Sequence, residues 1–324
     1  MSQQTLLIDE DNLAAAYQQH IQPFWARDVI QGSFTSHDQL KIAYAYALNP
    51  QAIGSVVISS GRIEAYLKYK EVMFDLYRAG YSVFIIDHRG QGMSGRMTAN
   101  PHMGYVKDFA DYVADFELFI QQVVLPHSSG PLMLLCHSMG SAIGAMYVLA
   151  FPRRFNKVVF CAPMFGIRPA LPGWLSNLLI GTHLAWGKLL GRQYAYFAGQ
   201  GDYVDSEFAL NRLTHSQARY QQFRHEYMTN PHIQLGGVTG HWLYAAAKAM
   251  DKIEQQAADF PIPALIIQAG NDQIVDNARQ RRVVNNMPQA SIQIIPNAKH
   301  EVLMEQDQYR QPAMQALLAF FSAR

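Results

Sequence analysis

The chain has 324 residues and is nearly neutral, because 26 Lys and Arg face 25 Asp and Glu. Apolar residues make up 49% of it and charged residues only 16%, a composition that excludes a disordered or low-complexity chain. The lack of a basic excess also argues against a nucleic-acid-binding protein. The length is sufficient for about one to three domains with a sizeable core.

The cysteine count and the N-terminal sequence exclude further classes. Cys136 and Cys161 are the two cysteines, too few for a disulfide framework or a cysteine-rich metal cluster. The N-terminal sequence MSQQTLLIDEDNL has acids where a secretory signal needs a basic and then an apolar stretch, so we expect no such signal. Residues 169–187 lack Asp, Glu, Lys and Arg, but glycine, proline and polar residues interrupt them, and we expect no transmembrane helix.

Short apolar runs alternate with helical periodicities along most of the chain. The run at 54–59 predicts a buried strand, and the apolar stripe between residues 69 and 77 predicts a helix that ends at Gly80. The same pattern predicts strands at 81–86, 132–136, 158–161, 264–269 and 292–295, and helices at 109–120, 141–151 and 311–321. Strands that alternate with helices are joined by right-handed crossovers. We therefore expect an α/β fold with a mostly parallel central sheet flanked by helices.

Residues 163–260 interrupt this alternation. They are rich in aromatic residues and helical stripes, and they show no clear buried strand. We interpret them as a helical cap inserted between late strands, with residues 1–162 and 261–324 forming the core.

The segment from Cys136 to Gly140 is the strongest candidate for a catalytic site. It lies between a predicted strand and a helix that begins with small residues, which is the context of a nucleophile elbow with Ser138 at its tip. Small side chains are needed two positions before and after such a serine. Gly140 meets this need, and Cys136 is a small residue where glycine is usual.

A serine nucleophile requires a base and an acid that orients the base, and in this kind of fold they follow the serine in the order acid, then histidine. Asp272 lies in the loop after the strand predicted at 264–269. Asp276 is the rival, but its place before the next helix is explained by an N-cap. His300 is the only histidine after Asp272, and it follows the last predicted strand. We predict Asp272 as the acid and His300 as the base.

An oxyanion hole needs two backbone N–H donors. Met139, the residue after the nucleophile, is expected to provide one of them. The other is expected from Arg62, in the loop that follows the first predicted strand, where Gly61 permits a tight turn. Taken alone, Gly61 is better explained by a plain turn at the strand end.

Other motifs do not indicate a cofactor or a metal. Residues 90–95 spell GxGxxG after a strand, but no helix opens there, so the dinucleotide fingerprint lacks its context. His225, His232 and His241 do not have metal-ligand spacing. We expect neither a metal nor an organic cofactor.

Several of these motifs together resemble the α/β-hydrolase branch of monoacylglycerol lipases and bacterial lysophospholipases. The residues that carry the resemblance are Ser59–Glu64, Asp87–Gly92, His137–Gly140, Ala162–Ile167, Asn211–Ser216 and Lys299–Glu301. The similarity extends from about Phe24 to Phe321 and is strongest to bacterial lysophospholipases associated with the inner membrane. Cys136 and Ser60 depart from the usual glycine and histidine, and neither departure removes a catalytic side chain.

The resemblance implies Ser138 as nucleophile, Asp272 as acid and His300 as base. It implies hydrolysis of the carboxylic ester of a single-acyl lipid, with a lysophospholipid favoured over a monoglyceride. Monoacylglycerol lipase, a general carboxylesterase and a proline-type aminopeptidase are the enzymatic alternatives. A lipid-binding or partner-binding protein without catalytic activity is the alternative from another class.

The substrate contacts are less well defined by the sequence. An apolar stripe is available to line an acyl-chain pocket or to seal the cap onto the core: Leu171, Trp174, Leu175, Leu178, Leu179, Ala185 and Trp186. Four arginines are candidates for a phosphate clamp, or are solvated surface residues: Arg192, Arg212, Arg219 and Arg224. We expect a cytoplasmic protein, with peripheral contact to the inner membrane as an open alternative. The sequence does not indicate the oligomeric state.

Overall fold

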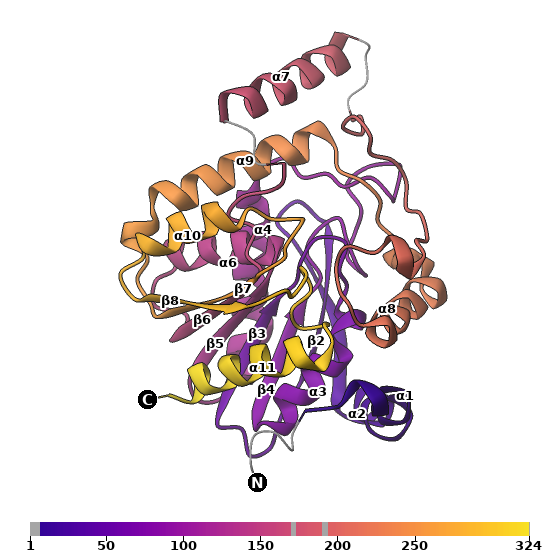
Figure 1. Ribbon diagram of the computed structural model, residues 1–324, viewed down its shortest axis with the longest axis vertical. Helices are drawn as coiled ribbons and strands as arrows, with labels where there is room; N and C mark the ends of the chain where they lie inside the picture. The colour runs from indigo at the N-terminus through magenta and orange to yellow at the C-terminus, as the bar shows by residue number, and fades with distance from the viewer. Residues whose placement is uncertain (1–6, 170–172, 190–193, 324) are drawn as a thin grey trace.

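The computed structural model describes residues 7–169, 173–189 and 194–323. Within these ranges one eight-stranded sheet crosses the molecule in the order β1-β2-β4-β3-β5-β6-β7-β8 (Figure 1). The strands are β1 (Val29–Thr35), β2 (Lys41–Ala47), β3 (Gly54–Ser59), β4 (Tyr81–Ile86), β5 (Leu132–His137), β6 (Lys157–Cys161), β7 (Ala264–Ala269) and β8 (Ala290–Ile295). β1 and β2 pair antiparallel with their neighbours, and the other strands run parallel. The expected mostly parallel α/β sheet is confirmed.

The central strands consist of residues buried without interruption. Every residue of β3, β4, β5 and β7 is buried, because helices cover both faces of a parallel sheet. This is why continuous apolar runs, and not alternating ones, identify these strands in the sequence. The edge strands β1 and β8 are partly exposed, in keeping with their position.

Two layers of helices enclose the sheet. The helices are α1 (Leu13–Ala16), α2 (Gln22–Asp28), α3 (Lys70–Arg78), α4 (Phe109–Phe119), α5 (Leu125–His127), α6 (Met139–Ala150), α7 (Gly173–Leu189), α8 (Gln217–Thr229), α9 (Gly240–Gln255), α10 (Asn277–Asn285) and α11 (Asp307–Ser322). Apolar residues of α4, α6, α9 and α10 join one core cluster. Those of α3, α8 and α11 join a second cluster on the other side of the sheet.

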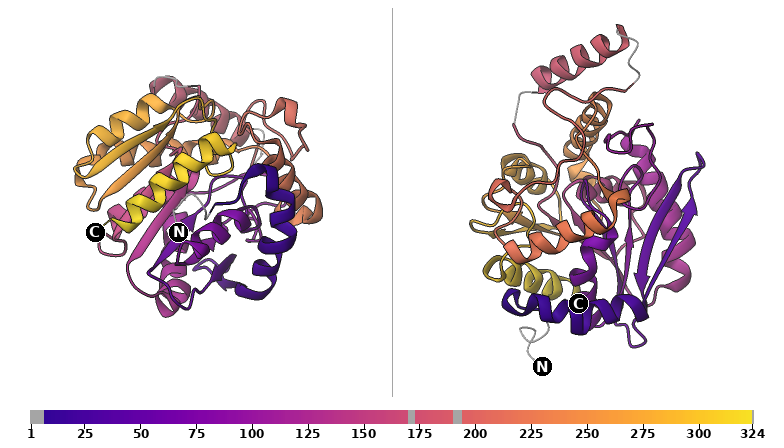
Figure 2. Two further views of the ribbon diagram at one scale, coloured as in Figure 1. Left: turned by 60° about the horizontal axis from the view of Figure 1, so that its bottom comes forward. Right: turned by 90° about the vertical axis from the view of Figure 1, so that its right-hand side faces the viewer.

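The segment between β6 and β7, predicted as a cap, contains α7, α8 and α9. α9 packs against α6 and α4 in the first core cluster, and α8 belongs to the second. α7 packs against α9 and otherwise stands apart at one end of the molecule, opposite the N-terminal helices (Figures 1 and 2). In the part of the chain that the structure describes, no helix has both the length and the apolar character needed to cross a bilayer.

Candidate active site

Ser138 lies in the sharp turn between β5 and α6. Its backbone adopts φ 50° and ψ −117°, which is rare for a residue with a side chain and typical of strained functional turns. The Ser138 N–H donates to the carbonyl of Cys161 at 3.0 Å, and the Ser138 carbonyl accepts from the N–H of Met164 at 3.0 Å. These two hydrogen bonds to the end of β6 and the loop after it fix the serine at the carboxyl edge of the sheet.

Close packing around the Ser138 turn explains why the residues near it are small. A Cβ atom at Gly140 would collide with the carbonyl of Ser59 at the end of β3. A Cβ atom at Gly144 would collide with the Sγ of Cys136. The turn therefore accommodates a cysteine at 136, where glycine is common, because Gly144 leaves room for the sulfur. Cys136 and Cys161 are both buried free thiols.

Ser138, His300 and Asp272 form a continuous chain of hydrogen bonds. The His300 Nε2 lies 2.9 Å from the Ser138 Oγ, and its Nδ1 lies 2.8 Å from Asp272 Oδ2. All three residues are at least 93% buried, since their exposed fractions are 7%, 4% and 4%. This arrangement is able to remove the proton of the serine hydroxyl while the carboxylate fixes the orientation of the imidazole.

Asp272 is held as a carboxylate by its surroundings. Its Oδ1 accepts hydrogen bonds from the backbone N–H groups of Ile274 at 2.8 Å and Val275 at 3.0 Å. Burial alone would raise the pKa of Asp272, but His300 and these two donors outweigh burial and lower that pKa below its ordinary value. The rival, Asp276, caps α10 by accepting a hydrogen bond from the N–H of Ala278 at 2.9 Å.

The two predicted oxyanion donors lie in adjoining segments. Met139 is the first residue of α6, so its N–H has no acceptor within the helix. Arg62 lies in the loop after β3, and this loop is held against the elbow because the Ser59 hydroxyl donates to the Gly140 carbonyl at 3.0 Å. Gly61, the predicted turn residue, is buried there, and its N–H donates to the Glu64 carboxylate.

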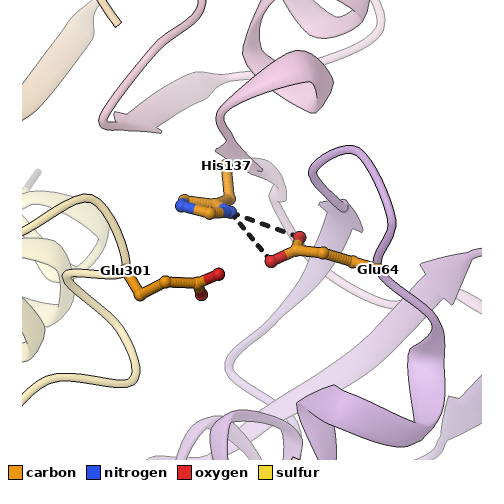
Figure 3. A group of neighbouring side chains, drawn as sticks. All are labelled: Glu64, His137 and Glu301. Atoms are coloured by element: carbon orange, nitrogen blue, oxygen red, sulfur yellow. Dashed lines mark hydrogen bonds and ion pairs between the residues drawn. The ribbon is translucent and has the colours of Figure 1, made fainter. Parts of the chain in front are cut away.

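A buried group of charged side chains lies beside this chain of hydrogen bonds, and Figure 3 shows three of its members, Glu64, His137 and Glu301. The Lys68 Nζ bonds to Glu64 and to Glu301 at 2.6 Å each. His137 points its Nδ1 at Glu64, 3.2 Å away, and its Nε2 lies 3.2 Å from the His300 carbonyl. We call these four residues, Glu64, Lys68, His137 and Glu301, the charged cluster. It joins the loop after β3 to the loop that carries His300.

The charges within the charged cluster follow from its contacts. Burial opposes ionisation of Glu64, but Lys68 and His137 outweigh it and hold the pKa of Glu64 well below its ordinary value. Burial likewise disfavours a charged His137, but the Glu64 carboxylate outweighs it and raises the pKa of His137 to about 9. His137 is therefore an imidazolium at neutral pH, and two cations balance two carboxylates.

The charged cluster does not suit a metal ion, although atoms of Glu64, His137 and Glu301 lie within 4.8 Å of one another. The ammonium group of Lys68 already occupies the position between the two carboxylates, and His137 is protonated. In the part of the chain described here, these three residues form the only grouping of metal-ligating side chains.

Sequence reasoning assigned no role to the charged cluster. Glu64 and Glu301 lie within the motifs that carried the family resemblance, and Lys68 follows Glu64 at the i+4 spacing of a helical ion pair. That spacing was an available signal. The link to Glu301, 233 residues further along the chain, depends on the tertiary fold.

The predicted apolar stripe is largely exposed. Trp174 is 69%, Leu178 55% and Trp186 65% accessible. Leu179, from the same stripe, lines a cleft of about 770 Å³ between α7 and α9 that is also lined by Ile180. Leu171 lies outside the described residues.

The four candidate phosphate-binding arginines lie in different environments. Arg219 is buried and paired with Glu71 and Asp307, which contradicts its interpretation as a solvated surface residue. Arg224 pairs with Asp205 at 2.7 Å. Arg212 is exposed and precedes Leu213, whose carbonyl accepts a hydrogen bond from the N–H of Glu301 at 2.8 Å, which places it near the His300 loop. Arg192 lies outside the described residues.

Known proteins resemble this chain in sequence and in fold. A family model described as "Serine aminopeptidase, S33" matches residues 50–307. The chain is 35% identical to "Lysophospholipase L2" of Escherichia coli over 97% of this chain and 93% of that protein. It is 24% identical to a "Monoacylglycerol lipase" of Mycolicibacterium smegmatis over 85% and 91% of the two chains. Among solved structures, a soluble variant of monoglyceride lipase from Saccharomyces cerevisiae matches 90% of this chain and 94% of its own, with a TM-score of 0.68 and 17% identity, which shows a shared fold.

Proposed function

The chain belongs to the serine aminopeptidase S33 family and has the α/β-hydrolase fold, and on this premise we propose that it is a serine esterase that hydrolyses lysophospholipids. The hydrogen-bonded chain from Ser138 through His300 to Asp272 is the observation that carries the proposal. The 35% identity to a lysophospholipase over nearly the whole length supports the substrate class.

The proposed reaction follows the geometry of these three residues. The Ser138 Oγ attacks the acyl carbonyl carbon while the His300 Nε2 accepts its proton, and Asp272 stabilises the resulting imidazolium. The N–H groups of Met139 and Arg62 bind the oxyanion that develops on the carbonyl oxygen. His300 then protonates the departing alkoxide, which leaves as the glycerophosphate part of the lipid. Water hydrolyses the acyl-enzyme by the same steps in reverse.

We further propose that residues 163–260 act as a cap over this site, with residues 1–162 and 261–324 as the hydrolase core. Two contacts support a cap that meets both catalytic loops. The Arg62 guanidinium donates to the Gly236 carbonyl, and the N–H of Glu301 donates to the Leu213 carbonyl. Gly61 and Arg212 are accordingly proposed to lie along the path of the substrate.

The exposed apolar side chains of α7 are proposed to meet the lipid at the surface of a membrane or micelle. Trp174, Leu178 and Trp186 leave a broad apolar surface on a helix whose charge is limited to Lys188. Combined replacement of Trp174 and Trp186 by Ser is expected to reduce cosedimentation with phospholipid vesicles. Leu210→Ser, which changes an apolar residue that is 76% exposed outside α7, is the matched control. Unchanged sedimentation of the double variant would contradict this contact.

A substrate panel tests the proposed function. The wild-type protein is assayed with lysophospholipids, monoglycerides, short p-nitrophenyl esters and amides, and kcat/KM is measured for each. We expect lysophospholipids to give the highest value and amides the lowest. A preference for short soluble esters would favour a general carboxylesterase, and a preference for monoglycerides would favour a monoacylglycerol lipase. Absence of turnover on every ester would overturn the enzymatic proposal.

A further inference from the structure

The side chain of Arg62 has an environment unlike that of the other buried arginines. It extends from the loop after β3 toward the segment before α9, where one Nη atom donates to the Gly236 carbonyl. Its guanidinium lies over the ring of Trp242, 5.6 Å from the centroid. Its Nε is buried and has no hydrogen-bond partner among the residues described, while Arg62 as a whole remains partly accessible.

No carboxylate balances this charge. Within the described ranges, Arg62 has no acidic group within 4.0 Å, whereas the buried arginines 89, 219 and 310 each pair with at least one acid. The ionisable side chains that face it are the phenols of Tyr112 and Tyr196. Burial lowers the pKa of Arg62 to about 10, so the guanidinium still carries its charge at neutral pH.

A partly buried cation without an anion is costly, because desolvation is not repaid by an ion pair. Here the cost falls on a loop that adjoins Ser138. The contacts that Arg62 does make, an aromatic face and one carbonyl, orient the guanidinium without neutralising it. An anionic ligand against the accessible part of Arg62 would provide the missing charge.

We propose that the Arg62 side chain binds the phosphate of the lysophospholipid substrate, so that one residue serves the oxyanion through its N–H and the head group through its guanidinium. This inference rests on the proposed function. The lengths are comparable, because six bonds separate the Arg62 backbone nitrogen from its Cζ and, in a lysophospholipid acylated at the terminal glycerol hydroxyl, about six separate the ester carbonyl carbon from the phosphorus. A guanidinium suits phosphate because it presents paired donors. A monoglyceride has only a hydroxyl at that position, which leaves the charge of Arg62 unbalanced.

The test compares a lysophospholipid and a monoglyceride that carry the same acyl chain. The measured quantity is the ratio of their kcat/KM values in the wild type, in Arg62→Met and in Arg62→Lys. Both substitutions keep the backbone N–H. We expect the ratio to fall in Arg62→Met by about tenfold to a hundredfold, the value of a charge-assisted hydrogen bond, mainly through KM for the lysophospholipid. Arg62→Lys is expected to recover part of the ratio because it keeps the charge.

Two comparison variants sharpen the result. Arg154, which lies beyond the far end of α6 and pairs with Glu117, provides the matched control, and Arg154→Met is expected to leave the ratio unchanged. Arg212→Met tests the other arginine near the catalytic loops. If the ratio of kcat/KM for the lysophospholipid to that for the monoglyceride falls in Arg212→Met and keeps its wild-type value in Arg62→Met, the phosphate is bound by Arg212 and the proposal is overturned.

A measurement on the unaltered protein covers the case in which Arg62→Met does not fold. Glycerol 3-phosphate is expected to inhibit hydrolysis of a monoglyceride by the wild type at lower concentration than glycerol does, and equal inhibition would contradict the phosphate site. The proposed function and this inference fail in different ways. If the proposed function is wrong, the wild type hydrolyses no lysophospholipid. If only the role of Arg62 is wrong, the wild type hydrolyses lysophospholipids and Arg62→Met keeps the wild-type ratio of kcat/KM values.

Discussion

The positive charge of His137 makes a specific contribution to stability that depends on pH. His137 is 3% exposed and lies between Glu64 and the His300 carbonyl. Its replacement by Gln keeps a polar side chain of similar reach but removes the charge. One cation, Lys68, then remains to balance the two carboxylates of the charged cluster, which leaves a net buried negative charge.

The size of the effect follows from the pKa of His137, which rises from 6.5 to about 9 on folding. One pKa unit corresponds to about 1.4 kcal/mol, so the protonated state is favoured in the folded protein by about 3 kcal/mol. Because the folded pKa is raised, this stabilisation is complete below pH 6.5 and is lost as the pH rises toward 9. Above that value, His137 is neutral in both the folded and the unfolded protein.

Urea denaturation between pH 6 and 9.5 measures this contribution. We expect the difference in unfolding free energy between the wild type and His137→Gln to fall by about 1.4 kcal/mol per pH unit from pH 6.5 to 9. Subtraction of the two proteins cancels the titrating groups that do not contact His137, and equal m-values would show that the two unfolding transitions expose the same surface. A difference that does not change with pH would refute the assignment of an imidazolium to His137.

Three further predictions separate catalytic from structural roles. Asp272→Asn is expected to lower kcat about 10⁴-fold, because the amide no longer holds the correct imidazole tautomer, while Asp276→Asn keeps kcat within about threefold; steady-state kinetics with equal losses in both would refute the assignment. Cys136→Gly is expected to cost about 2 kcal/mol of unfolding free energy, through a cavity beside α6 and a more flexible strand, with little change in kcat; thermal denaturation without a shift would contradict this packing. Gly140→Ala is expected to abolish activity, because its Cβ collides with the Ser59 carbonyl, and activity assays with normal turnover would show that the elbow is less tightly packed.

The sequence predicts the central part of this fold well because its signals are local. Strand β7 coincides with its prediction at 264–269, since a strand buried on both faces needs a continuous apolar run. α6 begins at Met139, two residues before the predicted start, because the elbow turns directly into the helix. The sequence predicts the last helix from residue 311, next to Pro312, but α11 begins at Asp307, because this helix accommodates the proline in its interior.

The sequence pattern did not predict the antiparallel strands β1 and β2. In β1 the polar residues Gln31 and Ser33 and Gly32 interrupt the apolar ones, and β2 alternates alanine with tyrosine after Ile42, without the aliphatic run of the central strands. β1 pairs with β2, and β2 pairs with β4, so their place in the sheet is a tertiary feature. The first strand that the sequence predicts is therefore the one at residues 54–59.

The candidate site shows the same division between local and tertiary information. Ser138, Asp272 and His300 were found because each follows a recognisable strand, and the structure brings all three together. The role of Arg219 could not be predicted, because its partners Glu71 and Asp307 are distant in sequence. The exposure of Trp174 could not be predicted either, because helical periodicity indicates an apolar face but does not show what covers that face.

Labelling with a fluorophosphonate tests the central claim most directly, because this reagent reacts with a serine only when a neighbouring base activates it. Peptide mapping by mass spectrometry then identifies the modified residue. We predict a single adduct on Ser138 in the folded wild type, and none in Ser138→Ala, in His300→Gln or in the heat-denatured protein. A folded wild type that stays unlabelled, or that carries its adduct on another residue, would contradict the assignment of Ser138 as the nucleophile.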